Sequence, residues 1–271
     1  MRGVVVDTGG FDGNQAEGVE VWGGCCEGGD GDGSGGVGEE GRDKADERVR
    51  GEGYMGWRCL LGRKACGADR KQAWFVRDDD GGGEVTHVKL CMFPDGGVAR
   101  FRLLGDVVPV WPVDRGVEVE LSAVAMGGVV VGVSDERFGR AGNLLLPGRG
   151  VDMGDGWETR RSRGRGEGMG DWVVVRLGGR GRVARVVVDT LHFRGNFPRG
   201  VRVEGVDVGV EGGEVVVGGE DGRWEVVVGE SGCERDWEHV FEVGGRVWTH
   251  LKLVILPDGG VKRFRAFGTR V

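Results

Sequence analysis

The chain has 271 residues, 59 of them glycine, and a formal net charge of −7. This length can bury the core of one large domain or of two ordinary ones. The negative charge argues against nucleic acid or an anionic membrane surface as a partner, because phosphate contacts need a basic protein surface.

Valine-rich segments predict an all-β fold, because β-branched side chains favour the pleated strand. The first lies at residues 4–6. Residues 23–53 are rich in Gly, Asp and Glu without apolar periodicity, and we expect a disordered loop there. Later strands are expected at 117–121, 129–133, 172–178, 183–190, 201–204, 224–228, 247–256 and 261–267. The turn residues Pro257 to Gly260 predict a closing hairpin between the last two.

Targeting and metal-binding signals are weak. No apolar stretch approaches the roughly 18 residues of a membrane span, and the first residues lack the zones of a signal peptide. A cytoplasmic protein is therefore expected. The six cysteines form no C-x-x-C pair and have no zinc-like companion histidines, which predicts reduced thiols and no metal site. The sequence leaves open which cofactor, if any, takes part.

The sequence contains an unequal internal repeat. Residues 4–14 align with 186–196, and residues 86–102 align with 249–265. We expect a first unit at 1–109 and a second at 110–271. About seventy residues of the second copy have no counterpart in the first, so the first unit is expected to lack its opening strands. Many short strands separated by glycine-rich turns suggest jelly-roll sandwiches, and the Trp172 to Gly178 pattern resembles galactose-binding-like domains.

Several motifs, in this order and spacing, resemble the allantoicase family. They are Ser134-Asp135-Glu136-Arg137-Phe138, Asn143-Leu144-Leu145, Asp155-Gly156-Trp157-Glu158-Thr159-Arg160-Arg161, Asp171-Trp172, the segment from Asp189 to Pro198 and the two Pro-Asp-Gly-Gly-Val turns. The resemblance implies tandem jelly-roll units that hydrolyse allantoate, a small molecule, to ureidoglycolate and urea in purine degradation. It leaves the oligomeric state open between a monomer and a homo-oligomer.

Two other functions compete with the hydrolase. The first unit lacks its own Asp-Gly-Trp-Glu-Thr-Arg-Arg segment, and Cys91 and Val254 stand where the family often has polar residues. Both departures would fit a catalytically inactive or fragmentary paralogue that serves as a binding or structural sandwich. A carbohydrate-binding module is a third reading, based on analogy of fold alone.

An allantoate site must hold a carboxylate, orient two ureido arms and assist the departure of urea. Arg160 and Arg161 are the candidates for the carboxylate, because the planar guanidinium can pair with both oxygens. The alternative is that both are solvated loop charges. Glu158 and Asp155 could accept ureido N–H bonds or transfer protons. Their alternatives are an ion pair with an arginine for Glu158 and a loop cap for Asp155.

Two histidines and an asparagine complete the candidate set. His192 follows a strand end, and Gly10 replaces it in the first copy, which indicates a proton carrier or a substrate donor, with an exposed loop histidine as the alternative. His250 has an equivalent, His87, in the first copy, so a structural histidine competes with a substrate-binding one. Asn196 either binds substrate or sets a turn.

Overall fold

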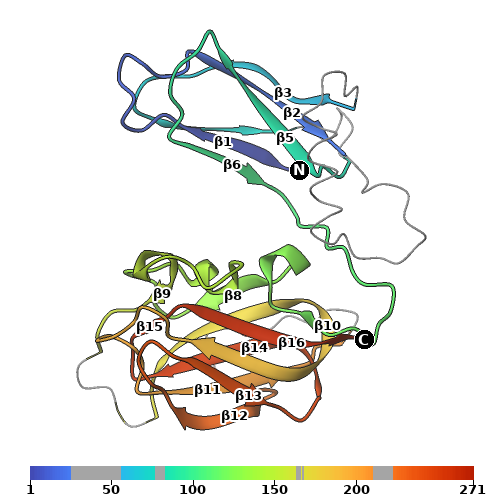
Figure 1. Ribbon diagram of the computed structural model, residues 1–271, viewed down its shortest axis with the longest axis vertical. Coiled ribbons are helices and arrows are strands. Elements are labelled where there is room, and N and C mark those ends of the chain that lie inside the picture. Colours follow the sequence, from blue (N-terminus) through green and yellow to red (C-terminus); the bar gives the residue numbers. More distant parts are fainter. Residues whose placement is uncertain (26–55, 77–82, 163–165, 167, 210–221) are drawn as a thin grey trace. The chain divides into compact units, whose positions relative to one another are not determined.

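The computed structural model describes residues 1–25, 56–76, 83–162, 166, 168–209 and 222–271. The chain divides into two compact units, Met1–Val110 (unit 1) and Trp111–Val271 (unit 2). Apart from short 3-10 turns, the regular structure of the described residues consists of strands (Figure 1). The predicted all-β class is therefore confirmed. In the part of the chain that the structure describes, no helix is long and apolar enough to cross a membrane.

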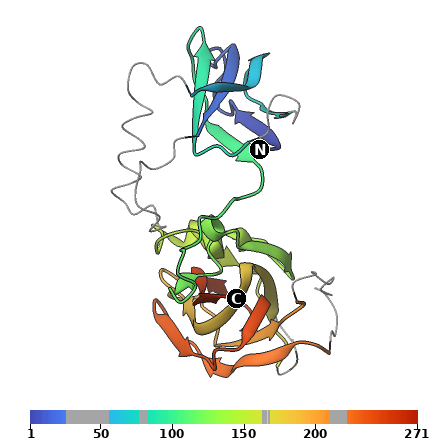
Figure 2. The ribbon, with the colours of Figure 1, turned by 90° about the vertical axis from the view of Figure 1, so that its right-hand side faces the viewer.

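Unit 2 is a sandwich of two layers built around one long strand, β10 (Asp171–Asp189). The first half of β10 pairs with β14 (Val247–Leu256) and β8 (Val129–Val133). Its second half pairs with β16 (Arg263–Arg270) and β13 (Glu238–Glu242). β11 (Gly200–Val206) and β12 (Glu225–Gly232) extend the first layer, and β7 (Val119–Glu120) extends the second. Figure 2 shows both layers from the side.

The continuity of β10 corrects the sequence prediction, which placed two strands in this region. A register shift between Arg176 and Gly181 marks where the strand passes from one layer to the other. A Cβ on Gly178 would lie 1.8 Å from the Met126 carbonyl oxygen, so this crossing needs glycine. In the sequence Gly178 resembles the end of a strand, but in the structure it forms a bend within β10.

The core of unit 2 explains the valine runs. Val173, Val175, Val186 and Val188 are fully buried and alternate along β10, with Trp157 packed in the same cluster. Burying one such aliphatic side chain contributes about 1.5–3 kcal/mol. Trp157 is fully buried in this core and fixes the start of the segment that carries Glu158.

Unit 1 repeats part of this arrangement. One layer contains β1 (Gly3–Asp7) between β4 (Lys71–Phe75) and β6 (Arg100–Leu104). The other contains β2 (Gly18–Gly24) between β3 (Arg58–Ala65) and β5 (His87–Phe93). The predicted loop at 23–53 lies outside the described residues except for 23–25, and Gly23 and Gly24 belong to β2.

The two units share hydrogen bonds as well as strand order. The Thr8 hydroxyl donates to the carbonyls of Gly67 and Arg70, and the Thr190 hydroxyl donates to those of Glu234 and Trp237. The repeat seen in the sequence is therefore a repeat of local structure. Equivalent positions in the two units can be compared residue by residue.

The two units differ in how their strand edges are covered. Within the described residues β5 pairs along one edge only, with β2, whereas its counterpart β14 pairs with both β11 and β10. Phe264 on β16 is fully buried, and its counterpart Phe101 on β6 is partly exposed. The segment from residue 111 to the middle of β10 supplies this extra cover in unit 2.

The predicted closing hairpin is wrong. β14 and β16 do not pair with each other, because β10 lies between them in the pairing order. The turn after β14 instead crosses between the layers and leads into β15 (Gly260–Val261), which pairs with β9 (Trp157–Glu158). The residues of the turn predicted the turn itself, but they could not show that another strand would lie between the two strands that it connects. This crossing brings the turn beside Glu158.

Candidate functional site

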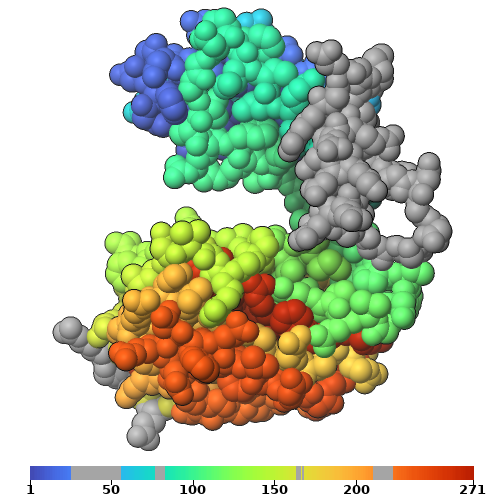
Figure 3. Space-filling model, in the orientation of Figure 1, coloured from blue at the N-terminus to red at the C-terminus, as the bar shows by residue number. Residues whose placement is uncertain are grey.

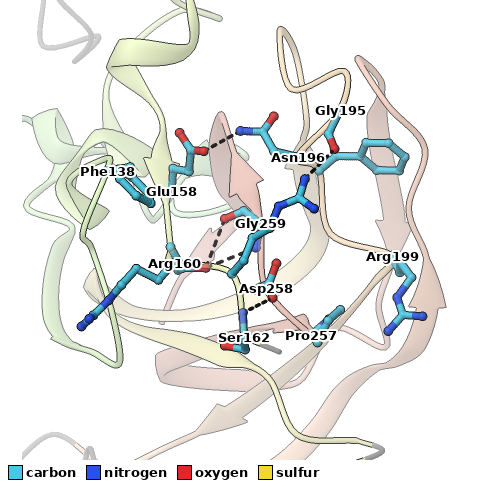
Figure 4. Close-up of a pocket in the computed structure, with 13 residues that line it drawn as sticks. Phe138, Glu158, Arg160, Ser162, Gly195, Asn196, Arg199, Pro257, Asp258 and Gly259 are labelled. Atoms are coloured by element: carbon cyan, nitrogen blue, oxygen red, sulfur yellow. Dashed lines mark hydrogen bonds between the residues drawn. The ribbon is translucent and has the colours of Figure 1, made fainter. Parts of the chain in front are cut away.

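A cavity of about 720 Å³ lies in unit 2, and three segments supply most of its lining. They are β9 with the residues after it, the loop after β10, and the turn after β14 (Figure 4). The yellow-green segment, which contains residues 134–161, lies at the surface of unit 2 (Figure 3). Charged and polar residues on the cavity wall are Glu158, Thr159, Arg160, Arg161, Ser162, Asn196, Arg199 and Asp258.

Glu158 and Asn196 face each other across this cavity. The Asn196 Nδ2 donates to the Glu158 Oε1 at 2.5 Å, and both side chains are partly buried. Figure 4 shows the two side chains pointing toward one another. Among the described residues Glu158 forms no ion pair with an arginine, so that alternative is wrong. The second carboxylate oxygen accepts no hydrogen bond from a described residue and can accept one from a ligand.

Backbone pairing holds Glu158 in place. Its neighbour Thr159 donates from the backbone to the Gly259 carbonyl at 3.1 Å, and the Thr159 hydroxyl accepts the Gly259 N–H at 3.2 Å. The Gly260 N–H donates to the Asn196 carbonyl at 2.7 Å. The turn after β14 thus ties both halves of the Glu158–Asn196 pair to one rigid support.

The two candidate arginines differ in their surroundings. The Arg160 Nε donates to the Asp135 Oδ2 at 3.1 Å, and its side chain is 70% exposed. Although burial by itself raises the pKa of Asp135, hydrogen bonds from the backbone N–H groups of Arg160 and Arg137 hold that pKa below its usual value. In Figure 4 Arg160 extends away from Asn196. Arg160 therefore contributes mainly backbone and stem to the cavity wall.

Arg161 is the better placed of the two. It lines the cavity, and its guanidinium has only a long contact of 3.5 Å to the Gly195 carbonyl. A contact at that length is a weak hydrogen bond. Its donors can therefore turn to an anionic ligand.

Sequence reasoning missed other cavity residues. Asp258, interpreted as a turn residue, accepts the Ser162 N–H at 2.6 Å and lines the cavity. Arg199 also lines it and was not singled out. The repeat held a usable signal, because the position equivalent to Arg199 in the first copy is Glu17.

Asp155 does not line this cavity. Its carboxylate pairs with the ammonium of Lys262 and, at 3.1 Å, with Arg263, whose side chains are 0% and 1% exposed. Arg263 also donates to the Asp155 carbonyl at 2.7 Å. The geometry favours an anchoring role three residues before Glu158.

His192 lies in the same loop as Asn196, but it is not among the cavity residues. Its φ is +68°, and its backbone N–H donates to the Asp236 Oδ1 at 2.7 Å. Gly10 has φ +80° and donates in the same way to Asp69. The replacement of glycine by histidine therefore falls at a left-handed backbone position that both units use.

His250 is buried within β14 and is 8% exposed. Its Nδ1 lies 3.0 Å from the Thr249 hydroxyl, as that of His87 lies 2.8 Å from Thr86. Burial, with a smaller contribution from Arg176, lowers the pKa of His250 to about 4. Seven residues of extended strand, roughly 23 Å, separate it from Pro257 at the cavity. This placement favours the structural alternative.

Metal ligands are not clustered in the described residues, where no group of three or more His, Cys, Asp or Glu side chains is arranged to hold an ion. The cavity offers a carboxylate, a carboxamide and guanidinium groups instead. Such groups suit a small polar anion with amide-like arms, since guanidinium binds carboxylate and the Glu–Asn pair offers both acceptors and donors.

The fold is a β-sandwich, and unit 2 carries a cavity lined by charged and polar side chains. A family model described as the allantoicase repeat matches residues 1–108 and 119–271. The chain belongs to the allantoicase family and carries two matches to its repeat.

Individual allantoicases are similar to the chain in sequence and in structure. The chain is 41% identical to the allantoicase of Neurospora crassa over 273 residues, which cover 100% of this chain and 71% of that protein. It is 44% identical to the allantoicase of Saccharomyces cerevisiae over 215 residues, covering 78% of this chain and 61% of the yeast protein. The chain thus spans less than two thirds of the yeast relative. The crystal structure of the yeast allantoicase superimposes with a TM-score of 0.74 at 38% identity, over 99% of this chain and 73% of that chain.

Proposed function

We propose that this chain is an allantoicase, which hydrolyses allantoate to ureidoglycolate and urea in purine degradation. The observation that carries the proposal is the Glu158–Asn196 pair, held at 2.5 Å in a cavity that Arg161 also lines. Family membership supplies the reaction, and the cavity offers groups that match each part of the substrate.

The reaction breaks one bond between the central carbon of allantoate and a ureido nitrogen. Water supplies the hydroxyl that the carbon gains and the proton that the departing urea nitrogen needs. Glu158 is the group that carries this proton, because Asn196 holds one oxygen of its carboxylate while the other oxygen accepts no hydrogen bond from a described residue. Proton transfer by a positioned carboxylate contributes on the order of 10²- to 10⁴-fold in rate.

The remaining groups bind and orient. Arg161 pairs with the substrate carboxylate, and the Asn196 carboxamide bonds a ureido arm while fixing Glu158. Asp258 is engaged by the Ser162 N–H and keeps the 159–162 segment against the turn. Arg160, tied to Asp135, supports this segment more than it touches substrate. His192, Asp155 and His250 do not line the cavity, and we assign them structural roles.

The direct test is incubation of the purified chain with allantoate, with urea and ureidoglycolate measured together. Formation of both in equal amounts, above a blank without protein, is the expected result. Absence of urea at high protein concentration would overturn the proposal for this chain. We also propose a cytoplasmic location, which fractionation of cells that express a tagged chain would test.

A further inference from the structure

Arg199 is an exposed arginine fixed at its backbone. Its N–H donates to the Leu256 carbonyl at 2.9 Å, and its carbonyl accepts the Cys233 N–H at 3.0 Å. The residue stands directly before β11, and these two bonds fix its backbone. Among the described residues its guanidinium has no hydrogen-bond or ion-pair partner.

Two cavities meet at this side chain. Arg199 and Pro257 line the cavity of Glu158, and both also line a neighbouring cavity of about 620 Å³. Figure 4 shows Arg199 on the opposite side of the Asp258 turn from Glu158. Arg199 therefore lies where the two cavities adjoin.

The internal repeat indicates that the fold does not require arginine at this position. The equivalent residue in unit 1 is Glu17, whose carbonyl accepts the Cys66 N–H at 2.8 Å. The same backbone bond thus forms with a side chain of opposite charge. The positive charge is present in the unit that has the Glu158–Asn196 pair.

Charges around Arg199 leave it available to an anion. Asp258 accepts the Ser162 N–H, and Glu158 accepts from Asn196. Glu230 lines the neighbouring cavity, but no ion pair joins it to Arg199 among the described residues. An arginine without an acidic partner beside a polar cavity is suited to a planar carboxylate.

We propose that Arg199 is a substrate-binding residue, which forms with Arg161 a two-sided clamp for the carboxylate of the substrate. The inference rests on the proposed allantoate hydrolysis and adds a specificity determinant to it. The clamp selects an anionic ligand over its neutral amide. Glu158 and Asn196 then receive the ureido arm.

The test compares the wild-type chain with Arg199→Gln and Arg199→Glu, the second of which reproduces the residue of unit 1. Arg235→Gln is the matched control, because Arg235 is exposed and lies outside both cavities. Calorimetry measures the binding of ureidoacetate, a carboxylate with one ureido arm, and of its neutral amide. Steady-state kinetics give KM and kcat for allantoate.

Both Arg199 variants are expected to weaken ureidoacetate on the order of 10- to 100-fold while binding of the neutral amide stays unchanged. KM for allantoate rises by a similar factor, with a smaller change in kcat. Unchanged ureidoacetate binding, equal losses for both ligands, or no binding to the wild-type chain would each overturn the clamp. If the wild-type chain binds ureidoacetate through Arg199 but releases no urea, the clamp stands and the proposed hydrolysis fails.

Discussion

The carboxamide of Asn196 donates to the carboxylate of Glu158 at 2.5 Å, across two segments that are 38 residues apart in the chain. This bond fixes the side chain that we assign to proton transfer. Its partners come from β9 and from the loop after β10, and the turn after β14 supports both.

Replacing Asn196 by Ala should lower kcat for allantoate about tenfold, because Glu158 loses its orienting donor, a loss of about 1.4 kcal/mol. Steady-state kinetics would measure the change. The same substitution in a Glu158→Gln background should have little additional effect, since groups that act as a unit are not additive. Fully additive losses would contradict coupling between the two residues.

Arg161→Gln should raise KM more than Arg160→Gln does. Arg161 has only a weak contact to the Gly195 carbonyl, whereas Arg160 is held by Asp135. Loss of a charge-assisted bond to the carboxylate corresponds to roughly 10- to 100-fold in affinity. Kinetics of the two variants side by side provide the measurement, and a larger KM effect at Arg160 would reverse our assignment.

Asp155→Asn should destabilise unit 2 by about 3–5 kcal/mol, because Lys262 and Arg263 then remain buried without their carboxylate. Burial already lowers the pKa of Lys262. Denaturant unfolding followed by tryptophan fluorescence would report the loss. Glu136→Gln, which breaks the exposed pair with Arg140, is the control and should cost less than about 1 kcal/mol. Equal effects would argue against an anchoring role for Asp155.

His250 should make stability depend on pH. Its pKa in the folded state is about 4, below the ordinary value of about 6.5. The unfolded chain therefore binds more protons between these values, and the free energy of unfolding falls as pH decreases from about 6.5 to about 4. The full effect is up to about 3 kcal/mol. His250→Gln should flatten this part of the pH profile; an unchanged slope would exclude His250 as its source.

Cys233 should react slowly in the native state, because burial raises the pKa of its thiol to about 11 and the thiolate is the reactive form. Labelling with iodoacetamide at pH 8, read by mass spectrometry of the peptide that contains Cys233, should be slow before unfolding and fast after it. Rapid labelling of the native chain would show that this segment beside Arg199 opens readily.

Much of the fold followed from the sequence, because its signals were local or repeated. Runs of valine, as at 186–188, indicate a buried strand wherever that strand lies in the sheet. The hairpin prediction failed because β10 inserts between β14 and β16, a tertiary choice that the Pro257 to Gly260 turn does not encode.

The candidate site was predicted in part. Glu158, Arg160, Arg161 and Asn196 line one cavity, since they come from motifs that backbone pairing brings together. Asp155 faces the buried Lys262 and Arg263 instead, and the direction of its side chain depends on strand β16 more than one hundred residues later. Arg199 carried no motif, and comparison with Glu17 in the other repeat is what reveals it.

Proton transfer by Glu158 is tested most directly by the rate of urea release from saturating allantoate. The wild-type chain is compared with Glu158→Gln, and Glu242→Gln on β13 is the control. We expect urea release by the wild-type and control chains, and a rate at least about 100-fold lower for Glu158→Gln. Equal rates for Glu158→Gln and the wild-type chain would contradict proton transfer by Glu158.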